Sequence, residues 1–418
     1  MNKFVARQPI LDRHKTIFAY ELLFRSGLEN FFHSDEPTQA SSIVVDSVLL
    51  HGIKSLAGKE KAFLNVTQDI LVRQFATCLP KEQAVIEILE TVEPNDQVID
   101  ACKALKQNGY LIALDDFVES EKIKPLIRLA DFIKVDFKTT PEWICRYLVE
   151  QYAPSGIKML AEKVETHEQF HDAMGMGYSY FQGYFFCRPE ILFGRDIPAY
   201  KLNYLLLLRE INREEPDLAK VENVLKRETS LTYKLLRYLN SAAFAFVGEI
   251  KSIRHALSLL GLKEIRKWTS LVSLACMADD KPDEVVVNSV VRGKFCENLA
   301  VHVRLENRST ELFLMGLLSM MDAILERPLD EILEELPISS DVKLALLNGT
   351  NLFRYVYELV LAYERGNWNR TAQFAAAMRV AESSITQAYI DAVRWGQKIF
   401  SIPVRRPHTD ERLTRFSY

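Results

Sequence analysis

Carboxylate and amide side chains recur at the ends of successive short apolar runs in the first half of the chain. The full set is Asn65, Glu87, Asp115, Asp116, Lys134, Asp136, Glu162, Glu165 and Gln182. Any one of them alone is most simply a solvated residue at the end of a strand. Several carboxylates gathered in one place repel one another, however, and a divalent cation would offset that repulsion. Because carboxylate and amide oxygens suit Mg²⁺ or Mn²⁺, the set predicts a site for such an ion.

The elements that must position these side chains are short strands that alternate with helices. Six mostly apolar runs end in a polar or charged residue, at 62–66, 84–88, 111–115, 132–136, 158–162 and 180–183. Helical stretches such as 95–107 lie between them. This alternation is typical of a parallel sheet, and its repetition predicts an α/β fold, a TIM-type β/α barrel. The carboxyl ends of barrel strands meet at one mouth, so the polar residues are expected to face one another there.

After Pro198 the hydrophobic pattern changes from short strands to helices. Helices are predicted at 200–214, 218–227, 232–240, 252–260, 262–277, 285–304, 309–325, 341–347, 352–364, 368–378 and 382–400. We therefore expect a barrel domain over residues 1–195, an all-α domain over 200–400 and a mildly basic C-terminal tail over 401–418.

Composition and charge disfavour several classes of function. The chain has 418 residues, too many for one ordinary core, and its 48% hydrophobic content indicates a folded protein. A net charge of −4 disfavours nucleic-acid binding driven by charge. The sequence shows neither an apolar leader nor a run long enough to span a membrane. Six scattered cysteines without a CxxC pair are typical of reduced core thiols, so we expect a cytoplasmic protein.

Short motifs in the first half follow one another in the order found in a known family. They are Gln8-Pro9-Ile10, Glu21-Leu22-Leu23-Phe24-Arg25, Asn65, Glu87-Ile88-Leu89-Glu90, Asp115-Asp116-Phe117, Asp131-Phe132-Ile133-Lys134-Val135-Asp136, Ala161-Glu162-Lys163-Val164-Glu165-Thr166 and Gln182-Gly183-Tyr184. Through these motifs, residues 3–192 resemble the EAL family of cyclic di-GMP phosphodiesterases and their inactive relatives. The resemblance implies cyclic di-GMP as the ligand and Mg²⁺ or Mn²⁺ as the cofactor of a competent site.

The resemblance also implies a metal-binding role for some of the matching residues. The first ion would be held by Glu21, Asn65, Glu87 and Asp115. Asp115 would bridge to a second ion that Asp116 also holds. Two adjacent divalent ions can activate water and neutralise phosphodiester charge.

Other matching residues would act on the water or the substrate, as the resemblance implies. The catalytic group would comprise Lys134, Glu162, Glu165 and Gln182. Glu162 would help to hold the metals, Glu165 and Gln182 would lie near the attacking water, and Lys134 would orient or deprotonate that water. Substrate would be contacted by Arg25, which can pair with a phosphate bidentately, and by Gln8, at a guanine or a phosphate.

Three departures from the family pattern bear on activity. Active members carry a glycine-rich loop where this chain has Val118-Glu119-Ser120, which removes backbone freedom and adds the charge of Glu119 beside the metals. In the family that loop couples metal binding to dimerisation. Leu22 replaces an alanine and adds bulk beside Glu21. Lys163 replaces a glycine, and its cation either takes over part of a metal's charge or extends into solvent.

Residues 200–395 resemble the HDOD family, a modified relative of HD-GYP domains. The resemblance rests on 231–241, on 252–257 and on Leu260-Gly261. The His-Asp doublet that would bind a metal is replaced by Ser319-Met320, so we expect neither hydrolysis nor a cofactor in this half. His255 lies on an apolar helical face and is more simply a core histidine than a ligand.

Two hypotheses remain close. The first is a bacterial cyclic di-GMP signal transduction protein with a divergent EAL domain, weak or inactive as a phosphodiesterase, and an HDOD domain that binds a protein partner. The alternative is an active metal-dependent phosphodiesterase that gives the linear dinucleotide pGpG. A third reading, a regulator that contacts DNA, lacks a basic stripe. The expected partners are cyclic di-GMP, an unidentified protein and a second copy of the chain, with neither membrane nor nucleic acid.

Overall fold

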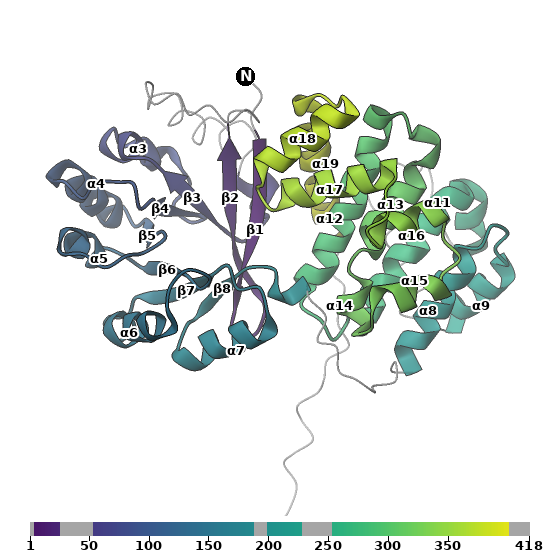
Figure 1. Ribbon diagram of the computed structural model, residues 1–418, viewed down its shortest axis with the longest axis horizontal. Coiled ribbons are helices and arrows are strands. Elements are labelled where there is room, and N and C mark those ends of the chain that lie inside the picture. Colours follow the sequence, from purple (N-terminus) through teal and green to yellow (C-terminus); the bar gives the residue numbers. More distant parts are fainter. Residues whose placement is uncertain (1–3, 26–52, 188–198, 228–252, 401–418) are drawn as a thin grey trace, which may run out of the picture.

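The computed structural model describes residues 4–25, 53–187, 199–227 and 253–400, and its first half is a closed eight-stranded barrel. The strands are β1 (Phe4–Asp12), β2 (Ile17–Arg25), β3 (Lys61–Val66), β4 (Ala84–Ile88), β5 (Leu111–Leu114), β6 (Phe132–Asp136), β7 (Lys158–Glu162) and β8 (Tyr180–Gln182). The six apolar runs of the sequence are β3 to β8, in that order. The prediction of a TIM-type barrel followed by an all-α part is therefore confirmed (Figure 1).

The first two strands form a hairpin that the sequence pattern did not predict. β1 pairs antiparallel with both β2 and β8, whereas β2 to β8 are parallel throughout. The parallel sheet expected from the six runs is therefore confirmed for β3 to β8, and β1 adds an antiparallel strand to it. The connection is only a short turn. The Asp12 carboxylate closes it by accepting the backbone N–H groups of His14 and Thr16, and Lys15 takes a left-handed φ of 60°.

Helices follow most of the parallel strands and pack around the outside of the barrel (Figure 1). They are α2 (Ile53–Ala57), α3 (Gln68–Val72), α4 (Asp96–Gln107), α5 (Lys124–Ile127), α6 (Glu142–Tyr152) and α7 (His167–Met176). The α4 helix begins where the Asn95 side chain accepts the N–H of Val98. The α7 helix begins at a reciprocal capping box between Thr166 and Gln169.

The second half is built from helices alone in its described residues. They are α8 (Ala199–Ile211), α9 (Leu218–Arg227), α11 (Ile253–Met277), α12 (Asp283–Leu299), α13 (Ser309–Leu318), α14 (Met321–Leu325), α15 (Leu329–Glu335), α16 (Ser340–Leu346), α17 (Leu352–Glu364), α18 (Trp368–Met378) and α19 (Glu382–Phe400). We call α8 to α19 the helical half. The helix predicted at 232–240 lies outside the described residues.

Some helix boundaries differ from the sequence prediction. The segment expected as one helix over 309–325 breaks between α13 and α14, where the Ser319 hydroxyl donates back to the Gly316 carbonyl and so competes with the helical pattern. Helix α15 was missed because it is short and follows Pro328, which signals a turn. Two predicted helices meet in α11 at a kink at Gly261, whose φ is 72°.

The structure bears on the expectations about membrane spans and about core cysteines. Among the described residues, no helix combines the length and apolar character needed to cross a bilayer. Four of the described thiols are buried, as expected of core cysteines, but Cys78 is exposed, so that expectation is wrong for Cys78.

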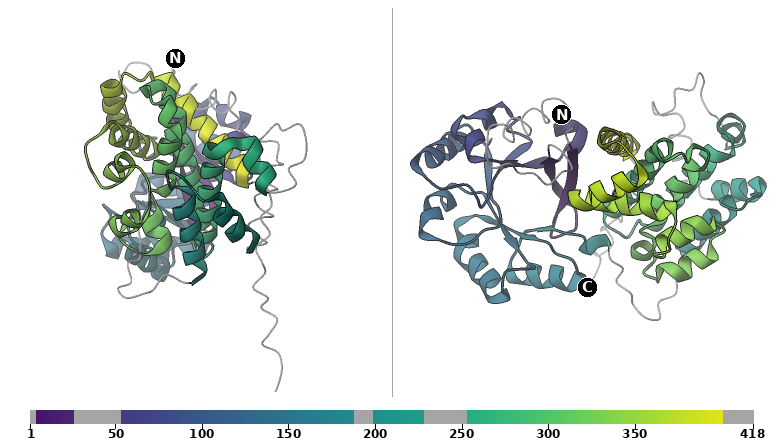
Figure 2. Two further views of the ribbon diagram at one scale, coloured as in Figure 1. Left: turned by 90° about the vertical axis from the view of Figure 1, so that its right-hand side faces the viewer. Right: turned by 45° about the horizontal axis from the view of Figure 1, so that its top comes forward.

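The helical half packs against the outer face of the β1–β2 hairpin, where α17 and α19 contact β1 and α12 contacts β2 through Tyr20 (Figures 1 and 2). Because residues 13–16 form only a turn, the hairpin supplies no crossover helix of its own. The exposed fraction of Arg7 is only 9%, and its guanidinium donates to the Leu56 carbonyl and lies 4.3 Å from the Tyr20 ring centroid. The Tyr20 hydroxyl in turn donates to Glu284 of α12 at 3.0 Å. The two halves therefore share one buried polar cluster and one continuous core.

The crossing of α12 and α13 gives a first prediction. A Cβ at Gly316 would lie 2.6 Å from both the Arg292 carbonyl oxygen and the Gly293 nitrogen, atoms that cannot move independently. We expect Gly316→Ala to lower the free energy of unfolding by about 2 kcal/mol or more, because overpacked cores must shift backbone. Urea unfolding measures it. The control is Gly175→Ala in α7, where the added Cβ meets nothing within 4 Å. Equal stability of the two variants would contradict the tight crossing.

The buried cluster between the halves gives a second prediction. Burial raises the pKa of Glu284 from 4.5 to about 7, although Arg7 and the Tyr20 hydroxyl act against the rise, while Asp283 and Glu364 add to it. The unfolded chain releases this proton near pH 4.5 and the folded chain near pH 7. The cluster therefore stabilises the fold fully below pH 4.5 and progressively less as the pH rises to about 7.

Replacing the carboxyl group with an amide should remove this dependence. Between pH 5 and pH 8 we expect the Glu284→Gln variant to lose less unfolding free energy than the parent, by about 2 kcal/mol. Urea unfolding of both proteins across this range gives the difference, in which the other titrating groups cancel. Parallel pH curves for the two proteins would show that Glu284 has an ordinary pKa.

Candidate metal and substrate site

A polar layer lies directly above an apolar layer inside the barrel. The apolar layer is Ile10, Ala19, Phe63, Val85, Ala113, Phe132 and Leu160. Because strand side chains alternate between faces, the residue two positions further along each parallel strand also points inward, one layer nearer the mouth. These residues are Glu21, Asn65, Glu87, Asp115, Lys134 and Glu162. On β1, which runs the opposite way, the corresponding residue is Gln8, two positions before Ile10.

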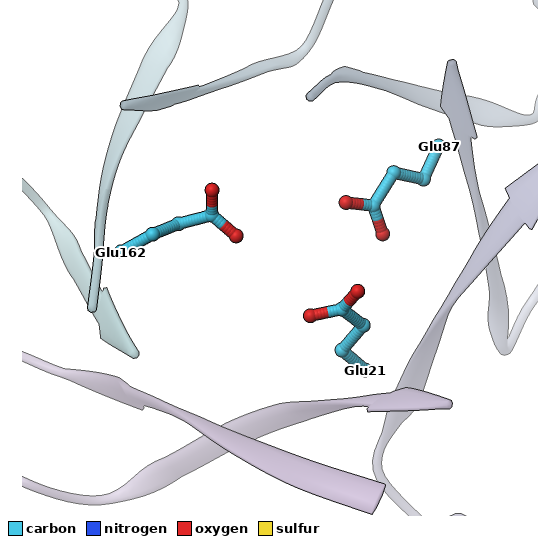
Figure 3. Close-up of side chains that lie close together, drawn as sticks. All are labelled: Glu21, Glu87 and Glu162. Atoms are coloured by element: carbon cyan, nitrogen blue, oxygen red, sulfur yellow. The ribbon is translucent and has the colours of Figure 1, made fainter. Parts of the chain in front are cut away.

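Lys134 lies at the centre of the polar layer and is fully buried. Its Nζ is 2.7 Å from a Glu162 oxygen, 2.9 Å from Asp115 and 3.6 Å from Glu21, and it also donates to Glu87. Figure 3 shows the three glutamates pointing toward one another from different strands. The structure thus brings Lys134 and four of the predicted carboxylates together.

Burial and charge act in opposite directions on these groups. Burial alone would lower the pKa of Lys134, but the surrounding carboxylates raise it well above its ordinary value. Burial raises the pKa of Glu87, and the Lys134 cation only partly offsets that rise. The pKa of Glu162 is raised to about 8, chiefly by burial and with Lys134 acting against it.

Two predicted amides orient the Glu21 carboxylate. The Asn65 Nδ2 donates to Glu21 Oε1 at 3.1 Å, and the Gln182 Nε2 donates to Glu21 Oε2 at 2.6 Å. Gln182 Nε2 also donates to the Gln8 Oε1 at 2.9 Å, so Gln8 joins the same network. With both amide groups committed as donors, the Asn65 and Gln182 carbonyl oxygens remain available as ligands.

Several oxygens of this layer are buried without a hydrogen-bond partner among the described residues. They are Asn65 Oδ1, Glu87 Oε2 and Gln182 Oε1. Beside the layer, Asp116 Oδ1 also lacks a hydrogen bond, and the Lys163 ammonium lies 3.7 Å from it. A buried acceptor left unpaired is costly, and each such case needs an explanation. Mg²⁺ and Mn²⁺ take such oxygens as ligands, so the residues present fit a divalent cation.

The carboxylates also fall into two groups with ligand spacing. Oxygens of Glu21, Glu87 and Glu162 lie within 4.8 Å of one another, and so do oxygens of Asp115, Asp116 and Glu162. The resemblance had Asp115 shared between two ions, whereas in this geometry the residue common to both groups is Glu162. Two neighbouring groups of this kind suit two ions.

Lys163 lies at the edge of the second group. Its ammonium is 2.6 Å from Asp136 and 3.7 Å from Asp116, so it adds a cation beside a predicted metal ligand instead of extending freely into solvent. The φ of Lys163 is 56°, in the left-handed region that glycine occupies without steric cost. This backbone geometry accounts for the glycine that the family motif has at this position.

The other departures lie elsewhere. Leu22 is buried in the outer core shared with the helical half, so its bulk does not press on the site as expected. Val118 is 77% exposed, and Glu119 accepts the Tyr152 hydroxyl at 2.7 Å, which ties this carboxylate to the end of α6. The Glu119 carboxylate, expected to place its charge beside the metals, is therefore bound to the end of α6.

The remaining predicted residues lie at the rim or outside the described side chains. Glu165 pairs with Lys138 at 3.1 Å, and both side chains are partly exposed. Strand β2 ends at Arg25, whose side chain lies outside the described residues, as does the side chain of His255 in α11. Ser319, at the place of the missing doublet, accepts a hydrogen bond from Arg292 at 2.8 Å.

Sequence reasoning missed the residues that the helical half brings to the mouth. The Arg365 carbonyl accepts a hydrogen bond from Gln8 at 3.4 Å, and the Glu364 carbonyl accepts one from Tyr184 at 3.1 Å. These partners lie 357 and 180 residues away from Gln8 and Tyr184 in sequence, and they act through backbone oxygens that every residue carries. No local pattern could therefore have indicated them.

Comparisons with known proteins place both halves in described families. A model of the EAL domain matches residues 39–189, and a model of the HDOD domain matches residues 197–329. The chain is 34% identical over 404 residues to the uncharacterized protein YuxH of Bacillus subtilis, covering 94% of this chain and 98% of that protein. It is also 34% identical over 400 residues to the cyclic di-GMP phosphodiesterase CdgJ of Vibrio cholerae, covering 95% and 93%.

Among solved structures, the BlrP1 calcium and cyclic di-GMP complex of Klebsiella pneumoniae is 25% identical, covers 45% of this chain and 56% of that one, and has a TM-score of 0.38. The relatives in Bacillus and Vibrio match almost from end to end. The chain therefore belongs to the family of proteins in which an EAL domain is followed by an HDOD domain.

Proposed function

We propose that the protein acts in cyclic di-GMP signalling, and that its barrel is a divalent-metal-dependent phosphodiesterase that opens cyclic di-GMP slowly to pGpG. The observation that carries the proposal is the set of buried oxygens in the polar layer that lack hydrogen-bond partners among the described residues. An inactive scaffold would gain nothing from keeping such costly groups. The likeness to CdgJ, which is named as a cyclic di-GMP phosphodiesterase, supports the same ligand.

The ligand groups of the polar layer suggest where the ions would bind. Glu21, Asn65 and Glu87 would hold the first ion, and Asp115 and Asp116 would hold the second. Glu162, the residue common to the two groups, would contribute to both. When bound, two divalent ions supply water activation and neutralisation of the phosphodiester charge.

The other side chains of the mouth would position water and substrate. The Lys134 ammonium, held in place by its carboxylate neighbours, would orient the attacking water by donating a hydrogen bond. Gln182 would hold the Glu21 carboxylate in one orientation, and Glu165 would lie near the water from the rim. Arg25 would pair with a substrate phosphate, and Gln8 would contact a guanine or a phosphate.

Lys163 favours a slow enzyme. Its ammonium lies 3.7 Å from Asp116 and would repel a second ion there. A receptor that binds cyclic di-GMP without hydrolysing it is the second candidate. The observation that favours it is the same contact between the Lys163 ammonium and Asp116. The helical half, with Ser319 and Met320 in place of a metal-binding doublet, would serve as the protein-interaction part, through a partner or a second copy.

The proposal is tested by hydrolysis of cyclic di-GMP with Mn²⁺, with calorimetric binding run under Ca²⁺ on the same preparation. Turnover to pGpG is expected. We expect Glu21→Ala to reduce kcat by about 100-fold or more, since outer-shell changes alone cost 10- to 100-fold at metal sites. The matched control is Glu93→Ala, which removes an exposed carboxylate a few residues beyond β4 and should keep parental activity.

Each outcome of this test has a distinct meaning. Binding without turnover would make the protein a receptor. The absence of both binding and turnover would refute the barrel as the working site. A Glu21→Ala variant that hydrolyses as fast as the parent would refute the metal assignment.

A second test concerns the cation beside Asp116. We expect Lys163→Gly to raise kcat/KM by about tenfold at low Mn²⁺ and less at saturation, because one unit charge at this distance is worth about 1–4 kcal/mol. The matched control is Lys15→Gly, which removes a lysine of nearly the same left-handed φ. Lys15 lies in the hairpin turn at the start of β2, at the end of the barrel away from the mouth. If the two variants respond alike to Mn²⁺, Lys163 does not limit the second ion.

A further inference from the structure

The last turn of α17 and the residues just after it contact β1, β2 and the segment that directly follows β8. The Tyr363 hydroxyl donates to the Val5 carbonyl of β1 at 3.2 Å, and this contact is buried. Gly366 lies against β2, since a Cβ built on it would be 3.0 Å from Leu23 Cδ1. Tyr184, two residues after β8, donates to the Glu364 carbonyl.

These strands are the ones that bear Gln8, Glu21 and Gln182. The amide of Gln8 donates to the Arg365 carbonyl of the helical half, and its own carbonyl accepts from Gln182. Gln182 then donates to Glu21, a predicted metal ligand. An unbroken hydrogen-bond chain therefore runs from the end of α17 to the site.

The end of α17 is itself held from inside the helical half. Both oxygens of the Glu364 carboxylate bind the Arg292 guanidinium of α12, at 2.7 Å for the closest pair. Arg292 also donates to Ser319 at the end of α13. Because both ions are largely buried, loss of one partner would leave an uncompensated charge and force the helix end to rearrange.

We propose that Glu364 is a positioning residue for the barrel site. By pairing with Arg292 it holds the residue 365 carbonyl where it orients Gln8, and through Gln8 the amide of Gln182 and the carboxylate of Glu21. It also holds the residue 364 carbonyl, which anchors Tyr184 just after β8. The inference rests on the proposed function for its catalytic meaning. It also gives the helical half a defined effect on the barrel, since any change in the packing of α12 against α13 reaches Glu21 through this pair.

The test compares two glutamates of α17 that differ in what they hold. Glu364→Gln removes the pair with Arg292. Glu358→Gln is the matched control. Glu358 lies six residues before Glu364 in the same helix, and its side chain is 16% exposed, against 13% for Glu364. It pairs with Arg354 and Arg370 instead of Arg292. Tyr184→Phe, which removes a single hydroxyl, is a second variant that does not unpair a buried charge.

Metal affinity is measured by calorimetry with Mn²⁺ on the full chain, with thermal unfolding to show that each variant is folded. We expect Glu364→Gln to weaken Mn²⁺ binding about tenfold, as outer-shell changes do, and Tyr184→Phe to weaken it in the same direction by a smaller factor. Glu358→Gln should stay within twofold of the parent. A folded Glu364→Gln variant with parental Mn²⁺ affinity would overturn the proposal.

A spectroscopic readout separates this inference from the proposed function. In protein labelled with ¹⁵N-glutamine, the side-chain amide signals of Gln8 and Gln182 should move in Glu364→Gln and Tyr184→Phe but not in Glu358→Gln. If the parent binds neither Mn²⁺ nor cyclic di-GMP, the proposed function fails while these signals still decide the positioning role. Unmoved signals in both Glu364→Gln and Tyr184→Phe would refute it.

Discussion

Everything at the mouth of this barrel depends on how the repulsion among its carboxylates is relieved. A closed barrel brings the ends of its strands to one point, and here that point holds Glu21, Glu87, Asp115 and Glu162. The buried ammonium of Lys134 lies within reach of all four and makes the arrangement tolerable in the folded chain. One cation does not satisfy every oxygen, however. The acceptors left unpaired are what make the mouth a candidate for divalent ions.

The second constraint is the hairpin at the start of the chain. Since β1 and β2 are joined by a turn alone, no crossover helix lies between them. Helices α17 and α19 pack on the outer face of β1, and α12 contacts β2 through Tyr20 (Figure 2). The burial of Arg7 and Tyr20 there uses partners from the helical half, since Tyr389 accepts from the Arg7 backbone N–H and Glu284 accepts from the Tyr20 hydroxyl. The same two strands carry Gln8 and Glu21 on their inner faces. Packing of the helical half is thereby joined to the geometry of the site.

The sequence was most informative where local pattern and topology agree. The runs that became β3 to β8 end in the residues that now surround Lys134, because alternation along a strand and convergence of strand ends are general properties. Strands β1 and β2 were missed since polar residues such as Arg7 and Glu21 occur on both of their faces, and Tyr389, which accepts from the Arg7 backbone N–H, lies 382 residues away. The glycine that the family motif has in place of Lys163 is a local pointer to its left-handed conformation, whereas nothing local indicates that backbone carbonyls at the end of α17 reach the mouth.

The central claim is that the polar layer around Lys134 accepts two divalent ions. The most direct measurement is the number of Mn²⁺ ions bound per chain, obtained from the electron paramagnetic resonance signal of free Mn²⁺ during a titration with cyclic di-GMP present. The account predicts two bound ions, the second weaker because Lys163 lies beside Asp116. A protein that binds no Mn²⁺, or only one ion at saturation, would contradict it.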